Sequence, residues 1–201
     1  MKQLLAYTNC EQGKDDAVKA AKWHREQDML IAGTYFEGDK ESFTGCSVGC
    51  MYAPYNGYKG KNLHYLSESV HGIPEWLTRV RDTFFEKLSS DKRNDWHVDF
   101  MEAPRKGAPL DTIKPAFMVF ILKSNLDNFD HDKFPDVKAA VDGSIALWQR
   151  NDIGSDEWES AQSAVESVAE SAGWSVAWSA SYDKFVNELL RLMRECEPVT
   201  S

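Results

Sequence analysis

The segment GTYFEGDKESFTGCSVGCM, from Gly33 to Met51, decides how the rest of the chain is organised. It contains two of the four cysteines and four of the twelve glycines. A glycine precedes a cysteine twice, at Gly45-Cys46 and Gly49-Cys50, and the two pairs are four residues apart. Because four residues make about one helical turn, both thiols are predicted to project from one face of a short helix, Thr44–Tyr52. The glycines on that helix allow a neighbouring element to approach closely.

Length and composition indicate a soluble globular protein. The chain has 201 residues, of which 42% are hydrophobic and 27% charged, so it can bury a core without disulfides. The net charge is −9, and the excess of acids is concentrated between residues 127 and 170. Such a surface repels phosphate backbones, so duplex nucleic acid is not an expected partner.

The start of the chain, MKQLLAYTNCEQ, lacks the long apolar core of a signal peptide, and no apolar run reaches the length of a membrane span. The longest apolar run, AFMVFIL at Ala116–Leu122, is well short of about 18 residues. Without such a segment, the four cysteines favour a reducing compartment with free thiols. We therefore expect a cytoplasmic protein without a membrane partner.

The hydrophobic periodicity predicts a mainly α fold, a compact multi-helix domain with an acidic C-terminal helical region. The run AFMVFIL is assigned to a helix that begins at Pro115, and residues 34–43 are predicted to form a loop or a small hairpin. The expected helices are 15–31, 44–52, 63–70, 74–88, 94–101, 115–123, 136–150, 155–172 and 174–196. Residues 1–124 are expected to form a helical core with the Gly-Cys segment and basic loops. Residues 125–201 are expected to supply acidic amphipathic helices packed on that core, within one domain.

Three segments of the chain resemble a family of uncharacterised proteins of phages and bacteria. They are HREQDMLIAGTY (24–35), FTGCSVGCM (43–51) and HGIPEWLTRVRDTFFEKL (71–88). Members share an H-x-x-x-D…G-T-Y pattern, a G-C-x-V-G-C core and a G-I-P-x-W-L helix. They often end in helices rich in alanine and aromatic residues, to which SAGWSVAWSASY is similar. The resemblance implies a phage setting, in which the protein would act in the host cytoplasm, and implies no particular chemistry.

Cys46 is a candidate nucleophile in this segment. Free amides and the helix dipole at the start of a helix lower the pKa of a thiol. His24 would act as its general base, and Asp28, four residues later on the predicted helix 15–31, would orient the imidazole. The alternative is that Cys46 and Cys50 belong, with their glycines, to a seam of small residues that only packs.

A metal site is a further alternative. Cys46 and Cys50, with His24, His64 or His71, would supply two thiolates and two imidazoles. However, no second pair of cysteines or histidines completes a known zinc pattern. We therefore expect no metal and no cofactor.

The loop GYKGKN, from Gly57 to Asn62, is a candidate anion site. Its glycines allow backbone amides to converge, and Lys59 and Lys61 add positive charge ahead of a predicted helix. It does not match a phosphate-binding P-loop. A solvated basic turn is the alternative.

Two faces that lack bulk are expected to pack together. One is the alanine face Ala17–Ala21 of the predicted helix 15–31, and the other is the Gly45/Gly49 face. This packing would bring His24 and Asp28 beside the cysteines and Tyr35. The predicted ligand-binding residues are His24, Tyr35, Cys46, Cys50, Lys59, Gly60, Lys61 and His64.

The favoured function is binding and sequestration of a small nucleotide-derived ligand, which in a phage setting would be a host defence signal. Bases and glycines gather in the first half of the chain, which supports this choice. Two alternatives stay open. One is a cysteine-dependent enzyme that acts on a similar molecule through Cys46, His24 and Asp28. The other is an acidic inhibitor of a host protein. Self-association of the chain also stays open.

Overall fold

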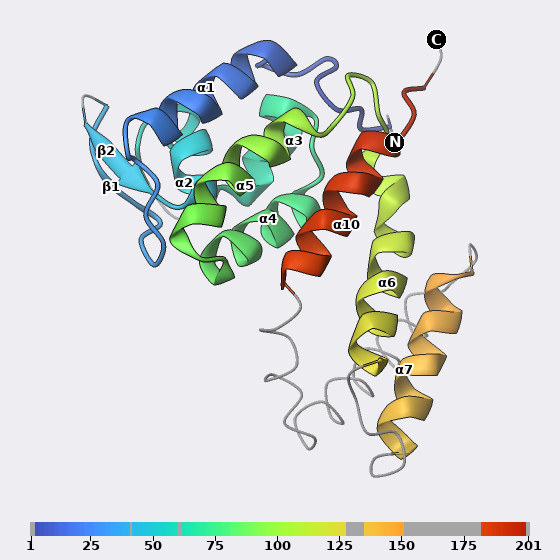
Figure 1. Ribbon diagram of the computed structural model, residues 1–201. Coiled ribbons are helices and arrows are strands. Elements are labelled where there is room, and N and C mark those ends of the chain that lie inside the picture. Colours follow the sequence, from blue (N-terminus) through green and yellow to red (C-terminus); the bar gives the residue numbers. More distant parts are fainter. Residues whose placement is uncertain (1–2, 41, 60–61, 128–134, 151–181, 200–201) are drawn as a thin grey trace. The chain divides into compact units, whose positions relative to one another are not determined.

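The computed structural model describes residues 3–40, 42–59, 62–127, 135–150 and 182–199 (Figure 1). The protein is mainly α, as the sequence predicts, with eight α-helices and one two-stranded sheet in these ranges. The chain divides into two compact units, Met1–Thr112 with Leu189–Ser201, and Ile113–Glu188. This division differs from the expected boundary at residue 124.

The first unit contains the Gly-Cys segment and the helices around it. Residues 34–43 take part in a hairpin, in which β1 pairs antiparallel with β2 and Phe36 lies opposite Gly45. The elements are α1 (Lys14–Glu26), β1 (Phe36–Gly38), β2 (Phe43–Gly45), α2 (Ser47–Tyr52), α3 (Leu66–His71), α4 (Glu75–Lys87) and α5 (Ser90–Glu102). Short 3₁₀ turns are formed by Ala53–Asn56, Leu63–Tyr65 and Leu110–Ile113.

Helix α1 ends five residues earlier than predicted. The chain leaves the helix after Glu26, and Asp28 takes a left-handed conformation with φ of 53°. The next residues bond to β2 instead, because Ile31 N donates to Gly45 O and Gly45 N donates to Met29 O, at 2.8 and 2.9 Å. Backbone groups that would have continued the helix are thus used by the sheet.

Helix α1 lies along α5 (Figure 1). Its inner face buries Ala17, Ala21 and His24. Its outer face leaves the large side chain of Trp23 49% exposed.

Helix α2 is the most buried element of the first unit, since all six of its residues are buried. A Cβ atom added at Gly45 or Gly49 would lie 2.5 or 1.7 Å from the carbonyl oxygen of Tyr35. The close neighbours of this glycine face are therefore the backbone of Tyr35 and Phe36. The prediction that the alanine face of α1 fills this place is wrong, because the β1 end of the hairpin occupies it.

In the second unit, α6 (Lys114–Leu126) packs against α7 (Pro135–Trp148). Helix α6 contains the run AFMVFIL, which confirms its assignment to a helix. Helix α10 (Tyr182–Glu195) begins in this unit, and its residues from Leu189 onward belong to the first unit. The predicted helix 155–172 and the first part of that at 174–196 lie outside the described residues. None of the described helices is long and apolar enough to span a membrane.

Candidate functional site

Helix α4 carries two adjacent polar residues that belong to different clusters in the first unit. Arg81 is fully buried and contacts His97 on α5. Asp82 is partly exposed and lies beside Cys46, at the start of α2. We call the first cluster the arginine network and the second the thiol–carboxylate cluster.

The arginine network is centred on a guanidinium that is shielded from solvent. Nη2 of Arg81 lies 3.1 Å from Nδ1 of His97, and the guanidinium carbon lies 4.9 Å from the centre of the Phe100 ring. Within the described ranges, Nε and Nη1 of Arg81 have no hydrogen-bond partner, and no carboxylate forms an ion pair with it. A buried charge with so few partners is costly, which makes Arg81 an unusual core residue.

The arginine fixes the protonation pattern of its neighbours. Because a guanidinium only donates, Nδ1 of His97 accepts, and Ser47 Oγ at 3.0 Å also donates to that atom. Nε2 of His97 then carries the proton and faces Nδ1 of His24 at 3.4 Å. Burial, and then the charge of Arg81, lower the pKa of His24 to about 4 and that of His97 well below its usual value. Both imidazoles are thus neutral at pH 7.

A second set of hydrogen bonds extends from the interior to the surface. Nε2 of His71 lies 2.7 Å from Oε1 of Gln12, and Nδ1 of His71 lies 3.1 Å from the Tyr52 hydroxyl. Burial, and then Arg81, lower the pKa of His71 to about 3, so its ring is neutral. Since an amide oxygen can only accept, His71 Nε2 donates to Gln12 and Nδ1 accepts from Tyr52. The amide NH₂ of Gln12 is left to bind another partner.

Gln12 lines one of two adjoining surface hollows, which share Lys19 and Trp23. The hollows have volumes of about 530 and 720 Å³. The indole of Trp23 is supported by the buried ring of His24, with 5.4 Å between ring centres. The smaller hollow is lined by Glu11, Gln12, Asp16, Lys19, Ala20, Trp23 and Tyr55. The larger is lined by Lys14, Asp15, Val18, Lys19, Lys22, Trp23, Glu26 and Glu102.

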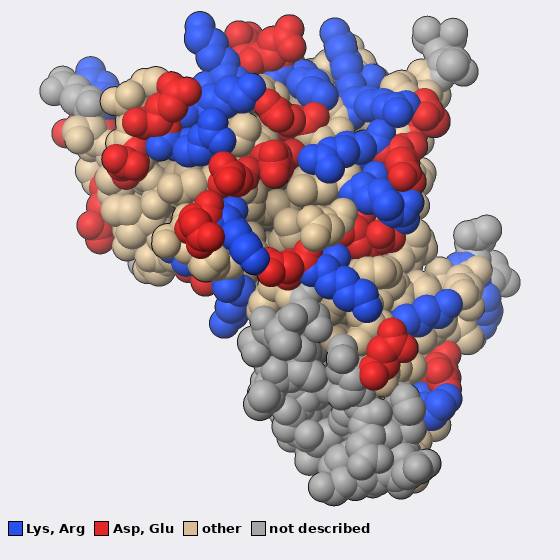
Figure 2. All heavy atoms as spheres, in the orientation of Figure 1, with Lys and Arg blue, Asp and Glu red and all other residues tan. Residues whose placement is uncertain are grey.

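The charges around these hollows are mixed. Lys14 Nζ donates to the carbonyl oxygen of Pro104 at 2.8 Å, and Lys22 forms an ion pair with Glu102 at 2.7 Å. Lys19 is exposed and forms no hydrogen bond or ion pair with a described residue. On the face drawn in Figure 2, basic and acidic side chains intermingle. The hollows therefore do not form a strongly basic phosphate cradle.

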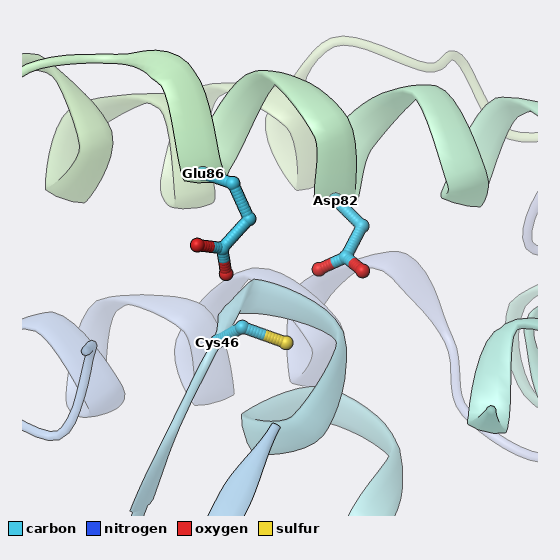
Figure 3. A group of neighbouring side chains, drawn as sticks. All are labelled: Cys46, Asp82 and Glu86. Atoms are coloured by element: carbon cyan, nitrogen blue, oxygen red, sulfur yellow. The ribbon is translucent and has the colours of Figure 1, made fainter. Parts of the chain in front are cut away.

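The thiol–carboxylate cluster joins the start of α2 to α4. Cys46 is the N-cap residue of α2, and its Sγ accepts a hydrogen bond from Gly49 N at 3.4 Å. The sulfur and one carboxylate oxygen each of Asp82 and Glu86 lie within 4.8 Å of one another (Figure 3). Glu86 Oε2 also accepts from Gly33 N at 2.7 Å. The start of α2 and helix α4 thus meet at one thiol, and the backbone of Gly33 contacts the cluster through Glu86.

Two of the predicted residues surround this cluster. His64 Nε2 lies 3.1 Å from Asp82 Oδ2, and His64 Nδ1 lies 3.0 Å from Asn62 Oδ1. The hydroxyl of Tyr35 accepts a hydrogen bond from Leu63 N, and the Tyr35 and His64 rings are 6.2 Å apart. The structure therefore brings Tyr35, Cys46 and His64 to one place around Asp82.

The contacts of His24 and Asp28 differ from those that their predicted roles require. His24 Nδ1 faces His97, and not a carboxylate. Asp28 is exposed and lies beyond the end of α1, in left-handed backbone. The prediction required α1 to continue to residue 31, whereas β2 captures the backbone at that point.

The surroundings of Cys46 oppose its predicted activation. Burial, and then the negative charge of Asp82, raise the pKa of its thiol well above the usual value. Burial also raises the pKa of Cys50 to about 12, and its thiol donates to the carbonyl oxygens of Met29 and Gly45. The six-residue helix α2 does not offset these effects.

The predicted basic loop is only partly described. Lys59 is exposed, whereas Gly60 and Lys61 lie outside the described residues. No described hydrogen bond or ion pair connects the Lys59 side chain to either cluster.

Sequence reasoning missed the buried position of Arg81, although a signal was present. Leu77, Arg81 and Phe85 are spaced by four residues, and all three are fully buried on one face of α4. A basic residue between two apolar residues at helical spacing indicates a buried charge. No comparable pattern in the neighbouring sequence indicates that Asp82 and His97 belong to these clusters.

The chain matches no family model, no curated protein and no solved structure.

Proposed function

We propose that the protein binds a small nucleotide-derived molecule, a nucleoside or a nucleoside monophosphate, in the two hollows beside Trp23. The observation that carries this proposal is the exposed Trp23, which lines both hollows and contacts the buried ring of His24 at a tilt of 58°. The two hollows are shallow and open to solvent, and their volumes lie in the range of small-molecule sites.

Trp23 provides a platform for a flat base. Stacking of a base on an aromatic side chain is worth about 1–3 kcal/mol, and it tolerates any base because every base has a π face. Tyr55, which is 37% exposed, lines the smaller hollow with Trp23. The two rings give this hollow apolar walls on which a base can rest.

Polar groups at the same place suit the remaining parts of a nucleoside. The amide NH₂ of Gln12 is held in one orientation by His71 and can donate to a base edge. Glu11 and Asp16, in the same lining, offer carboxylates that accept hydrogen bonds from ribose hydroxyls.

The charge balance limits the number of phosphates. Lys19 is the lysine shared by both hollows, whereas Lys14 and Lys22 already bind Pro104 O and Glu102. A single phosphate beside Lys19 matches this arrangement better than a triphosphate, which the nearby acids would repel.

The lining favours binding over chemical conversion. It contains no cysteine, serine, threonine or histidine, and its carboxylates, Lys19 and Tyr55 are the groups that bind the ligand in this proposal. In the phage setting that the sequence resemblance implies, tight binding without turnover would sequester a host signal.

Calorimetric titration with adenosine, guanosine, AMP and GMP tests the proposal. For the ligand that binds, Trp23→Ala is expected to weaken affinity by about 5- to 150-fold, the loss of one stacked base. Tyr65→Ala is the matched control, because Tyr65 is 53% exposed and lines neither hollow. Lys19→Ala should weaken binding of the monophosphate more than binding of the nucleoside.

Two results would contradict the proposal. One is the absence of saturable heat for all four compounds at millimolar concentration. The other is equal binding by the wild type and Trp23→Ala.

A further inference from the structure

The thiol–carboxylate cluster contains polar groups that the proposed ligand site does not use. The Cys46 side chain is almost fully buried, at 1% exposure, and its sulfur faces the carboxylates of Asp82 and Glu86 (Figure 3). Oδ1 of Asp82 is shielded from solvent and has no hydrogen-bond partner among the described residues. Two carboxylates beside one thiol repel each other and lack a positive partner at their centre.

From this geometry we infer that Cys46, Asp82 and Glu86 bind a divalent transition-metal ion of the zinc type. One thiolate and two carboxylates are a donor set that zinc accepts, with a fourth position for water. Zn–S and Zn–O bonds of about 2.3 and 2.1 Å place tetrahedral ligand atoms roughly 3.4–3.6 Å apart. The three ligand atoms, now within 4.8 Å, would need to close by about 1 Å.

The residues around the cluster are arranged to support such a site. His64 Nε2 holds Asp82 Oδ2 and leaves the shielded Oδ1 for the metal. Gly33 N holds Glu86 Oε2, so that Oε1 remains. Outer partners of this kind orient the ligands of metal sites.

Binding releases one proton. The Cys46 thiol loses its proton to solvent as the S–metal bond forms, and no electron is transferred. The metal replaces repulsion between the carboxylates with attraction to a shared cation. Affinity is therefore expected to fall as the pH is lowered.

The expectation of a metal-free chain relied on the Cys46/Cys50 pair. Cys50 cannot complete that pair, since its thiol donates to Met29 O and Gly45 O. The carboxylates come instead from α4, more than thirty residues later in the sequence. Spacing patterns do not detect ligands recruited in this way.

Cobalt(II) titration of EDTA-treated full-length protein tests the inference. We expect one ion per chain, a near-ultraviolet thiolate-to-cobalt charge-transfer band, and displacement by zinc but not by magnesium. Cys46→Ser should abolish the band. Asp82→Asn and Glu86→Gln should weaken cobalt binding at least 10-fold, and His64→Gln by about 10- to 100-fold.

Cys50→Ser and Glu75→Gln are the controls, a thiol on α2 and a glutamate on α4 that lie outside the cluster. Both should keep the band and the affinity. Circular dichroism verifies folding of each variant. If Cys46→Ser does not fold, the two carboxylate variants decide the matter. Absence of a charge-transfer band in the wild type, or unchanged cobalt affinity in both Asp82→Asn and Glu86→Gln, would overturn the inference.

Discussion

Nη2 of Arg81 lies 3.1 Å from Nδ1 of His97 in the interior of the first unit, and both side chains are fully buried. A permanent positive charge beside an imidazole opposes its protonation. The same guanidinium lowers the pKa of His24 and His71, after the larger effect of burial. Three histidines are therefore held neutral around one arginine.

This arrangement predicts a loss of stability in mild acid. The folded-state pKa values of His24 and His71, about 4 and about 3, lie below the unfolded value of about 6.5. Below pH 6.5 the unfolded chain therefore binds protons that the folded chain does not. The free energy of unfolding should fall by up to about 1.4 kcal/mol per pH unit for each histidine between pH 6.5 and pH 4.

Urea denaturation at pH 7.5, 6.0 and 5.0 measures this dependence. His24→Gln should reduce the slope of the free energy of unfolding against pH by up to the contribution of one bound proton. The reason is that the glutamine amide does not titrate in this range. A free energy of unfolding that is the same at pH 7.5 and pH 5.0 would show that these histidines are not held neutral in the fold.

The contact between Gly49 and the Tyr35 carbonyl oxygen predicts a sensitive position. A Cβ atom at residue 49 would lie 1.7 Å from that backbone oxygen, so α2 and the hairpin would have to separate. Gly49→Ala should destabilise the protein by at least about 2–3 kcal/mol. Thermal unfolding followed by circular dichroism measures the loss.

Gly143→Ala is the matched control for that experiment. Gly143 lies within α7, and a Cβ atom there would meet nothing within 4 Å. Alanine should be tolerated, or should stabilise α7 by about 0.5–1 kcal/mol through its higher helix propensity. Equal melting temperatures for the two variants would mean that the approach of Tyr35 to Gly49 is not close.

Cysteine alkylation should distinguish the four thiols. Cys10 is partly exposed, whereas Cys46, Cys50 and Cys196 are buried. Iodoacetamide at pH 7.5 should modify Cys10 first, and Cys46 only after urea unfolds the chain, because burial raises the Cys46 pKa and blocks access. Peptide mass mapping over time follows each site. Alkylation of native Cys46 at the rate of free cysteine would contradict its placement.

Local pattern predicted much of the helical framework. The apolar face of the helix 74–88 and the proline before AFMVFIL indicated α4 and α6, and both helices formed near the expected residues. The turn residues of 34–43 were consistent with the observed hairpin. These features depend on a few neighbouring residues, which is why sequence reasoning reached them.

Contacts between residues that are distant in the sequence determined the features that the sequence patterns did not predict. The sequence predicts a later end for α1 than the structure shows. The reason is that Met29 and Ile31 form backbone hydrogen bonds with Gly45 of β2, and these compete with the helix. Cys46 was expected to be an activated thiol, but its neighbours Asp82 and Glu86 come from α4. The sequence pattern does not identify Trp23 as a surface residue, because a single aromatic residue on a helix is usually part of the core.

Nuclear magnetic resonance of the indole N–H signals tests the central claim most directly. The protein has seven tryptophans, and Trp23→Phe assigns the signal of Trp23. We predict that AMP or GMP shifts this signal saturably, with smaller shifts for the side-chain amide of Gln12. Titration that leaves the Trp23 signal in place, or that instead shifts only signals remote from both hollows, would contradict ligand binding at this site.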